Sequence, residues 1–336
     1  MQRELGTTGL PVSRIGLGLA ALGRPGYINL GHAADLEHTV EAQDQHSVEA
    51  MRAHTHAVLD QAWALGVRYF DAARSYGRAE DFLGSWLRAR DIAPDAVTIG
   101  SKWGYTYTAG WQVEAEQHEV KEHSRAVLRR QWAETRANLG PYLDLYQIHS
   151  ATFASGVLEN AEVLAELARF KRDGTAIGLT LSGPDQPDVL RRALAVEVDG
   201  VRVFDTVQAT WNLLEPSVGE VLGEAHAAGL GVLVKEALAN GRLTPRNDHP
   251  AFAELFARLA AQAARLHTTI DALALAAVLA QPWADVVLSG AAIPAHLDSN
   301  LRARDVAWDD ESANALAPLA EPPVQYWQTR SNLEWN

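Results

Sequence analysis

The chain contains no cysteine among its 336 residues. Disulfides, thiolate metal sites and a cysteine nucleophile are therefore excluded. No apolar run approaches the ~20 residues that a membrane-spanning helix needs. The N-terminal residues 1–10 also lack the apolar core of a signal peptide. We therefore expect a cytoplasmic protein with no membrane partner.

Positive charge is scarce as well. Lys and Arg total 29 against 42 Asp and Glu, which gives a formal net charge of −13. Nucleic acids and anionic membrane surfaces attract basic patches, so neither is expected as a partner. A composition that is 47% hydrophobic and 21% charged is instead typical of a globular chain that buries a large core.

Eight apolar segments alternate with helical patterns along the chain. The expected strands cover about residues 14–20, 67–73, 97–103, 142–149, 175–182, 205–211, 231–238 and 285–291. The helical patterns cover about 47–66, 79–90, 124–139, 157–173, 187–196, 217–228, 252–280 and a segment from 294. Strands that alternate with helices imply a parallel sheet. Eight such units in roughly 300 residues predict an α/β fold, a single (β/α)8 TIM barrel.

The remaining segments are expected to belong to the same domain, residues 1–336. Residues 1–13 are predicted to form a hairpin before the first barrel strand. Long loops follow the first strand, at 24–46, and the third strand, and long loops often lie over active sites. The aromatic, proline-containing tail at about 320–336 predicts either a solvated tail or a flap on the barrel.

Ionisable side chains stand at or just after the ends of three expected strands. VRYFDAARSYG ends its apolar run at Asp71 and carries Tyr76 in the next loop, TIGSKWG carries Lys102, and LDLYQIHS carries His149. The C-terminal ends of barrel strands meet at the face where such barrels do their chemistry.

These four residue types suit carbonyl chemistry. A lysine lowers the pKa of a nearby phenol, and a carboxylate keeps that lysine charged. A histidine can position a carbonyl oxygen by hydrogen bonding. The set would serve as a general acid for carbonyl reduction or a general base for alcohol oxidation, with the hydride supplied by a cofactor.

The same segments resemble the aldo-keto reductase family. FDAARSYGRAEDFLG is similar to the family's Asp and Tyr segment, SKWG to its Lys segment, and LGPYLDLYQIHS to the segment that ends in its His. The resemblance extends to about residue 305. It implies a barrel that binds NADP(H) or NAD(H) and interconverts a carbonyl (aldehyde, ketone or sugar) and an alcohol. It also implies Tyr76 as proton donor, tuned by Lys102 and Asp71, with His149 orienting the substrate.

The resemblance further implies the residues that contact the cofactor, which are Thr180, Gln208, Lys235, Ala237, Leu238, Ser289, Gly290, Ala291, His296 and Asn300. Some positions depart from the family. Leu181 cannot replace the usual amide, and Lys235 stands where a tyrosine often stacks on the nicotinamide. Ala291 and His296 stand where basic residues often bind the 2′-phosphate, and His is a poorer phosphate ligand than Arg. The cofactor usual in the family still favours NADP(H) slightly over NAD(H).

Aromatic side chains are expected to form the substrate pocket. The candidates are Tyr27, Trp103, Tyr105, Trp211 and Trp327. Walls of this kind with few charges suit aldehydes, ketones or sugars better than strongly anionic substrates. The oligomeric state and the working direction are left open by these residues.

Two other functions stay open. Barrels use strand-end lysines to form Schiff bases, so Lys235 could serve an aldolase. The barrel could also be a cofactor-sensing subunit of a larger assembly, with residues 27–47 as the candidate partner surface. No metal site is expected, because His54 and His56 point to different faces of a helix and no group of ligands has zinc spacing.

Overall fold

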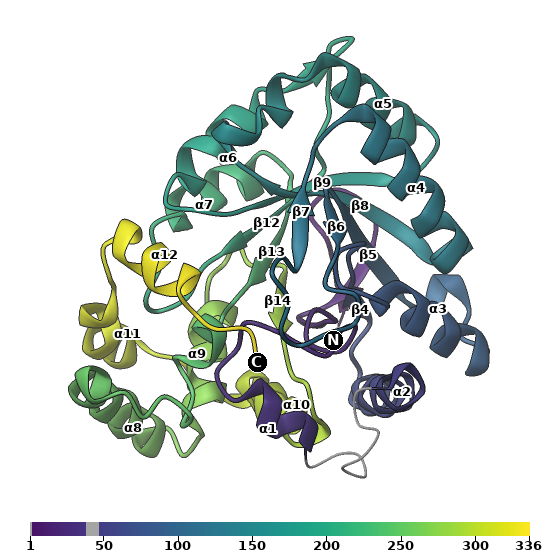
Figure 1. Cartoon of the computed structure of the whole chain (residues 1–336). Coiled ribbons are helices and arrows are strands. Elements are labelled where there is room, and N and C mark those ends of the chain that lie inside the picture. The colour runs from purple at the N-terminus through teal and green to yellow at the C-terminus, as the bar shows by residue number, and fades with distance from the viewer. Residues whose placement is uncertain (1, 38–46) are drawn as a thin grey trace.

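The computed structural model describes residues 2–37 and 47–336, so the end of the predicted 24–46 connection lies outside the described residues. Helices surround a central group of strands (Figure 1). Across the described ranges, no helix combines the length and the apolar character needed to cross a membrane.

Eight strands close into a parallel barrel, as the sequence predicts. They are β3 (Ile15–Gly18), β4 (Tyr69–Asp71), β5 (Thr98–Trp103), β8 (Leu143–Ala151), β9 (Ala176–Leu181), β12 (Thr206–Thr210), β13 (Gly231–Lys235) and β14 (Val286–Ser289). Each strand pairs with the next along the chain, and β14 returns to pair with β3 through Val287 and Ile15. All C-terminal strand ends therefore lie at one mouth of the barrel.

Helices follow the strands in the predicted order. They are α2 (Val48–Ala64), α3 (Ala79–Ala89), α4 (Arg125–Leu139), α5 (Ala161–Arg172), α6 (Gln186–Leu194), α7 (Gly219–Ala227), α8 (Ala253–Arg265), α9 (Ile270–Leu279) and α10 (Pro294–Leu301). Ser47 begins α2 as the predicted N-cap, and its side chain accepts a hydrogen bond from the Ala50 N–H. The pattern predicted at 252–280 forms two helices, because His267 adopts a φ of 52° and Thr269 caps the second.

Strand residues alternate between two cores, because successive side chains point to opposite faces. Tyr69 and Leu145 lie inside the barrel, whereas Phe70 and Tyr146 face the helices. The N-terminal hairpin, β1 (Gln2–Glu4) and β2 (Pro11–Ser13), lies where the sequence places it and adds Leu5 to the inner core. A Cβ at Gly231, the first residue of β13, would come within 2.5 Å of the Leu5 side chain, so the hairpin fits closely there.

Several elements lie outside the predicted alternation. The connection after β3 contains a helix, α1 (His32–Glu37), where only a loop is predicted. A hairpin, β6 (Tyr105–Tyr107) and β7 (Glu119–Lys121), forms in the loop after β5, and β10 (Glu197–Val198) and β11 (Val201–Arg202) form another. The chain ends with α11 (Asp310–Leu316) and α12 (Pro323–Ser331). Buried Tyr326 and Trp327 join the core beside α8 and α9, so the tail is a flap on the barrel (Figure 1).

Candidate active site

A cavity of about 720 Å³ lies at the C-terminal ends of the barrel strands. Its lining includes Gly18, Asp71, His149, Lys235 and Ser289, which come from the ends of different strands. The rest of the walls comes from other segments, among them the loops after β3, β4, β5 and β13, helices α9 and α10, and the C-terminal tail.

Three of the four predicted catalytic residues meet through hydrogen bonds at the base of this cavity. The Lys102 ammonium forms a buried ion pair with Asp71. The same Nζ donates to the Tyr76 hydroxyl at 3.4 Å and to the Ala72 carbonyl oxygen at 3.0 Å. Lys102 and Asp71 are 1% and 2% exposed, so their attraction is little screened by solvent. The pair fixes the ammonium beside the phenol.

Asp71 has more donors than the sequence suggests. Its Oδ1 accepts hydrogen bonds from the Tyr69 hydroxyl at 3.1 Å, from Gln208 Nε2 at 3.0 Å and from Gln147 Nε2 at 3.4 Å. A Cβ at Gly100 would lie 2.3 Å from the Tyr69 hydroxyl, which explains the glycine in TIGSK. Gln208 also lines the cavity, so it joins the carboxylate to the predicted cofactor side.

The Tyr76 phenol is kept protonated. Burial, and then the negative charge of Asp71, raise the pKa of Tyr76 well above its ordinary value, whereas Arg24 lowers it. The net shift is therefore upward and not downward as expected, although the Lys102 ammonium 3.4 Å away favours the phenolate. A phenol that stays protonated at neutral pH is able to donate its proton to a substrate oxygen.

The His149 imidazole is kept neutral. Burial, followed by the positive charges of Lys102, Lys235 and Arg24, lowers the pKa of His149 well below its ordinary value. Its ring stands edge-on to that of Tyr76, with 5.5 Å between the centroids. A neutral imidazole has one N–H, so it can donate a hydrogen bond to a carbonyl oxygen held beside Tyr76.

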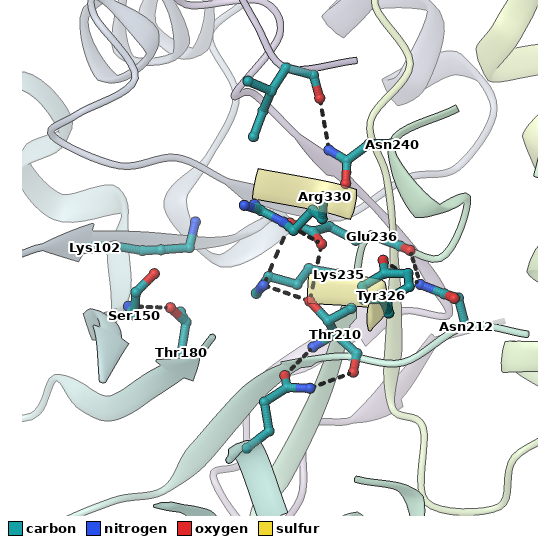
Figure 2. Close-up of polar contacts among 12 residues, drawn as sticks. Lys102, Ser150, Thr180, Thr210, Asn212, Lys235, Glu236, Asn240, Tyr326 and Arg330 are labelled. Atoms are coloured by element: carbon teal, nitrogen blue, oxygen red, sulfur yellow. Dashed lines mark hydrogen bonds and ion pairs between the residues drawn. The ribbon is translucent and has the colours of Figure 1, made fainter. Parts of the chain in front are cut away.

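Thr180, predicted to contact the cofactor, does not line the cavity. Its side chain is fully buried, and its Oγ1 accepts a hydrogen bond from the Ser150 backbone N–H at 2.7 Å. Ser150 has a φ of 55°, so the threonine holds a left-handed turn directly after His149 (Figure 2). Ser182, two residues further along, lines the cavity instead.

A polar cluster surrounds Lys235 at the end of β13 (Figure 2). Its Nζ donates to Thr210 Oγ1 at 2.7 Å and lies 3.7 Å from a Glu236 oxygen. Arg330 of α12 donates to the same carboxylate from Nε at 3.1 Å and from Nη2 at 2.6 Å. Burial lowers the pKa of Lys235 to about 8, while Arg330 and Lys235 together hold the pKa of Glu236 at about 2, against the effect of burial.

The other predicted cofactor residues line the cavity together. They are Ala237, Leu238, Ser289, Gly290, Ala291, His296 and Asn300. Asn300 Nδ2 donates to Ser289 Oγ at 2.8 Å, and space is open where a Cβ at Gly290 would project. Polar groups and an open glycine backbone at the start of a helix suit a dinucleotide phosphate.

One basic residue on this side is absent from the sequence prediction. Arg246 lines the cavity and donates to His296 Nε2 at 3.1 Å. It also forms a two-point ion pair with Asp35 of α1, one contact of which is 2.9 Å. Asp35 is 3% exposed, so the arginine next to His296 is neutralised by a buried carboxylate.

The aromatic predictions divide into two groups. Tyr27 and Tyr105 line the cavity. Trp103, Trp211 and Trp327 do not, which corrects three predicted pocket residues. Trp103 directly follows the inward-pointing Lys102, so it points outward and packs edge-on against His123. Trp211 packs against Trp283, and Trp327 lies behind Lys235, whose Nζ is 5.6 Å from its ring centroid.

The walls also carry more charge than predicted. Arg24, Glu119, Lys235, Glu236 and Arg330 all line the cavity, which corrects the expectation of walls with few charges. Arg24 is 3% exposed and donates to the Ser75 carbonyl at 3.0 Å and to Glu119 at 3.2 Å. No local motif marks Arg24 or Arg330 as a site residue, because each reaches the cavity through tertiary packing.

The last residues of the tail also line the cavity. Trp335 lines the cavity and stacks on His118, with 3.9 Å between ring centroids and 6° between planes. The Arg24 guanidinium lies 4.6 Å from the Trp335 ring and 5.3 Å from that of Tyr76. The predicted flap therefore reaches Tyr76 through Arg24. Within the described part of the chain, no group of three or more His, Asp or Glu has the arrangement of a metal site.

Comparisons with known proteins agree with this geometry. A model of the Aldo/keto reductase family matches residues 14–321. The chain is 26% identical to the pyridoxal 4-dehydrogenase of Microbacterium luteolum, over 98% of this chain and 96% of that protein. It is also 26% identical to the L-galactose dehydrogenase of Arabidopsis thaliana, over 95% of this chain and 94% of that protein. An aldo-keto reductase from Bacillus halodurans shares the fold, with a TM-score of 0.73 and 20% identity over 97% of this chain and 99% of that one.

Proposed function

The chain belongs to the Aldo/keto reductase family, whose members are NAD(P)(H)-dependent oxidoreductases that act on carbonyls, and we propose that Tyr76 is its proton donor. The proposed substrate is a small aldehyde, ketone or sugar, reduced to the alcohol or formed from it. One observation carries this proposal, the Tyr76 hydroxyl 3.4 Å from the buried Lys102 ammonium, in a cavity also lined by His149.

The residues that line the cavity fit a nicotinamide dinucleotide. The cavity of about 720 Å³ runs from His296 and Asn300 to Gln208 and Tyr76. At the proposed phosphate end, the space beside the Gly290 backbone is open. In the proposed arrangement Ser289 and Asn300 hold phosphate or ribose oxygens, and the Gln208 amide lies beside the nicotinamide. The bound cofactor would supply the hydride.

The protein's own groups handle the proton. In the direction of reduction, negative charge develops on the carbonyl oxygen as the hydride arrives. The neutral His149 N–H stabilises that oxygen by a hydrogen bond, and the Tyr76 hydroxyl donates its proton to it. The Lys102 ammonium, held by Asp71, stabilises the phenolate that remains. In the direction of oxidation the same phenolate accepts the alcohol proton.

We further propose that this site binds NAD(H) at least as tightly as NADP(H). The sequence resemblance favours NADP(H) slightly, but the basic residue beside His296 is Arg246, which is paired with buried Asp35. Ala291 offers no charge. A 2′-phosphate would therefore meet a carboxylate next to the arginine, and like charges repel.

Titration of the purified protein with NADH and NADPH tests the proposed function. The ten tryptophans provide a fluorescence signal. Binding of either cofactor is expected, followed by cofactor oxidation when a panel of aldehydes, ketones and sugars is added. Failure of a folded protein to bind either cofactor would contradict the proposal. In that case, trapping of a carbonyl compound on Lys235 by borohydride would identify the Schiff-base aldolase instead.

A further inference from the structure

Lys235 occupies a place in the cavity that a bound dinucleotide has to cross. Strand β13 lies between β12, which carries Gln208, and β14, which carries Ser289. Lys235 pairs in register with Thr210, two residues beyond Gln208 toward the mouth of the barrel. A molecule that extends from Ser289 to Gln208 therefore passes over the end of β13, where Lys235 lines the cavity.

The Lys235 ammonium is only partly neutralised. Glu236 is its nearest carboxylate, at 3.7 Å, but Arg330 holds the same carboxylate by shorter contacts, of which one is 2.6 Å. It also contacts the Thr210 hydroxyl and the Trp327 ring, neither of which carries a charge. Glu236 adopts a φ of 55°, an uncommon backbone conformation for a residue with a side chain. The chain therefore holds a strained turn that keeps this cluster together, as functional sites often do.

We infer that Lys235 makes the site prefer the reduced nicotinamide over the oxidised one, and that loss of the lysine proton removes the preference. This inference rests on the proposed function. The oxidised nicotinamide ring carries a positive charge and the reduced ring is neutral. A lysine ammonium beside the ring repels the first and leaves the second unaffected.

The pH dependence of the preference for reduced nicotinamide is set by the groups near Lys235 that change charge. The charged and titratable groups near it are Glu236 directly after its own strand, Arg330 on α12, Lys102 on β5 and His149 on β8. His149 is neutral at neutral pH because its pKa is lowered, whereas Glu236 stays ionised. Lys235, with its pKa lowered by burial to about 8, is the member of this group that changes charge in mildly alkaline solution.

The expected direction of the pH dependence follows from the charge of Lys235. Below about pH 8 the lysine is charged and oxidised cofactor binds poorly. Above that pH the lysine is neutral and oxidised cofactor binds more tightly, while reduced cofactor is little affected. Phosphate and adenosine contacts are the same for both forms, so the ratio of the two dissociation constants isolates the nicotinamide end.

The test measures the dissociation constants of NAD⁺ and NADH by tryptophan fluorescence from about pH 6.5 to about pH 9.5. For the unaltered protein, the NAD⁺-to-NADH ratio of dissociation constants is expected to fall by about tenfold across this range. In Lys235→Met the ratio should be constant and close to the alkaline value. Lys121→Met is the matched control, because Lys121 lies outside the cavity lining, and it should behave like the unaltered protein.

Arg330 provides a second variant that does not remove the lysine. In Arg330→Gln, Glu236 is free to pair with Lys235, so the pKa of the lysine rises and the transition should move to higher pH. Arg330→Lys should restore most of the original midpoint. A purely structural role for Arg330 would weaken both cofactor forms equally and leave the midpoint unchanged.

The outcomes separate the two proposals. If neither cofactor form binds, the proposed function fails. If both bind but their ratio is independent of pH, or if Lys235→Met keeps the pH dependence, the function stands and the inference about Lys235 is wrong. A ratio that falls with pH only when Lys235 is present supports both.

Discussion

Asp71 contacts more of the residues proposed to act in the site than its position in the sequence suggests. One carboxylate oxygen pairs with Lys102, and the other accepts from Tyr69 and Gln208. Gln208 lines the cavity where the nicotinamide is proposed to lie. The same carboxylate therefore connects the side of the proposed proton donor to the proposed cofactor side. Substitution of Lys102 should affect the rate of carbonyl reduction more than the affinity for the cofactor.

Lys102→Met should lower the rate of carbonyl reduction by about 10²-fold or more, because the phenolate left by proton transfer loses its nearby cation. Cofactor affinity should change by less than about threefold, since the side chain is buried below the cavity lining. Pre-steady-state rates and fluorescence titrations measure the two effects. Loss of cofactor binding together with rate would show that Lys102 acts on the fold instead.

Asp35→Asn should improve NADPH binding relative to NADH by about tenfold. The substitution removes the carboxylate that neutralises Arg246, and a free guanidinium can bind the 2′-phosphate. Asp298→Asn is the matched control, because it is exposed on α10, the helix that carries His296, and lies outside the cavity lining. An unchanged NADPH-to-NADH ratio in Asp35→Asn would show that the phosphate binds elsewhere.

At the scale of elements, the sequence predicts regular alternation well and cavity walls poorly. Ser47 and Gly66 mark the bounds of α2 because capping and helix termination are local properties. Trp103 and Trp211 are wrongly predicted to line the pocket because alternation turns a strand residue outward when its neighbour points inward. Arg24 and Arg330 are not predicted as cavity residues, because only the folded loops and tail bring them to the cavity.

The end of the tail at Trp335 should control access of substrate rather than of cofactor. Trp335 stacks on His118 of the loop between β6 and β7 and contacts Arg24, which lies over Tyr76. Trp335→Ala should raise KM for the carbonyl substrate by about tenfold, since a stacked aromatic wall is lost. NADH affinity should remain within about twofold.

Phe153→Ala is the control for this change, because Phe153 is an exposed aromatic residue outside the cavity lining. It should leave KM unchanged. Equal losses of substrate and cofactor affinity in Trp335→Ala would contradict the assignment of Trp335 to the substrate side.

For the whole molecule, the barrel strands run from Ile15 to Ser289, and the tail packs on the helices between β13 and β14. We therefore propose residues 1–336 as a single domain. The closed barrel follows from the sequence because eight strand–helix units allow few other topologies. The identity of the substrate does not follow, since it depends on side chains that distant segments of the chain bring to the cavity.

Stability should fall in acid because of buried histidines. Burial, and then the charge of Lys121, lower the pKa of His123 to about 4 in the folded protein. The unfolded residue titrates near 6.5, so the unfolded chain binds more protons between these values. This stabilisation, on the order of 3 kcal/mol, is complete above about pH 6.5 and is lost as the pH falls toward 4.

Thermal unfolding between about pH 4 and about pH 7 measures this effect. Half-buried Asp144 acts in the opposite sense, because its pKa is raised to about 6 and its contribution therefore decreases as the pH rises toward that value. His123→Gln should flatten the acid decline in Tm, whereas His249→Gln, at an exposed position, should not. An unchanged decline of Tm in His123→Gln would assign the loss of stability in acid to other groups.

The most direct measurement of the central claim compares Tyr76→Phe with the unaltered protein in a single turnover. Both proteins are saturated with reduced cofactor and mixed with a carbonyl substrate, and cofactor oxidation is followed. Tyr142→Phe, which removes a phenol outside the cavity lining, serves as control. We predict at least a 10³-fold loss in Tyr76→Phe, with cofactor affinity retained and the control unaffected. Oxidation in Tyr76→Phe within a few-fold of the unaltered rate would contradict the assignment of Tyr76 as the proton donor.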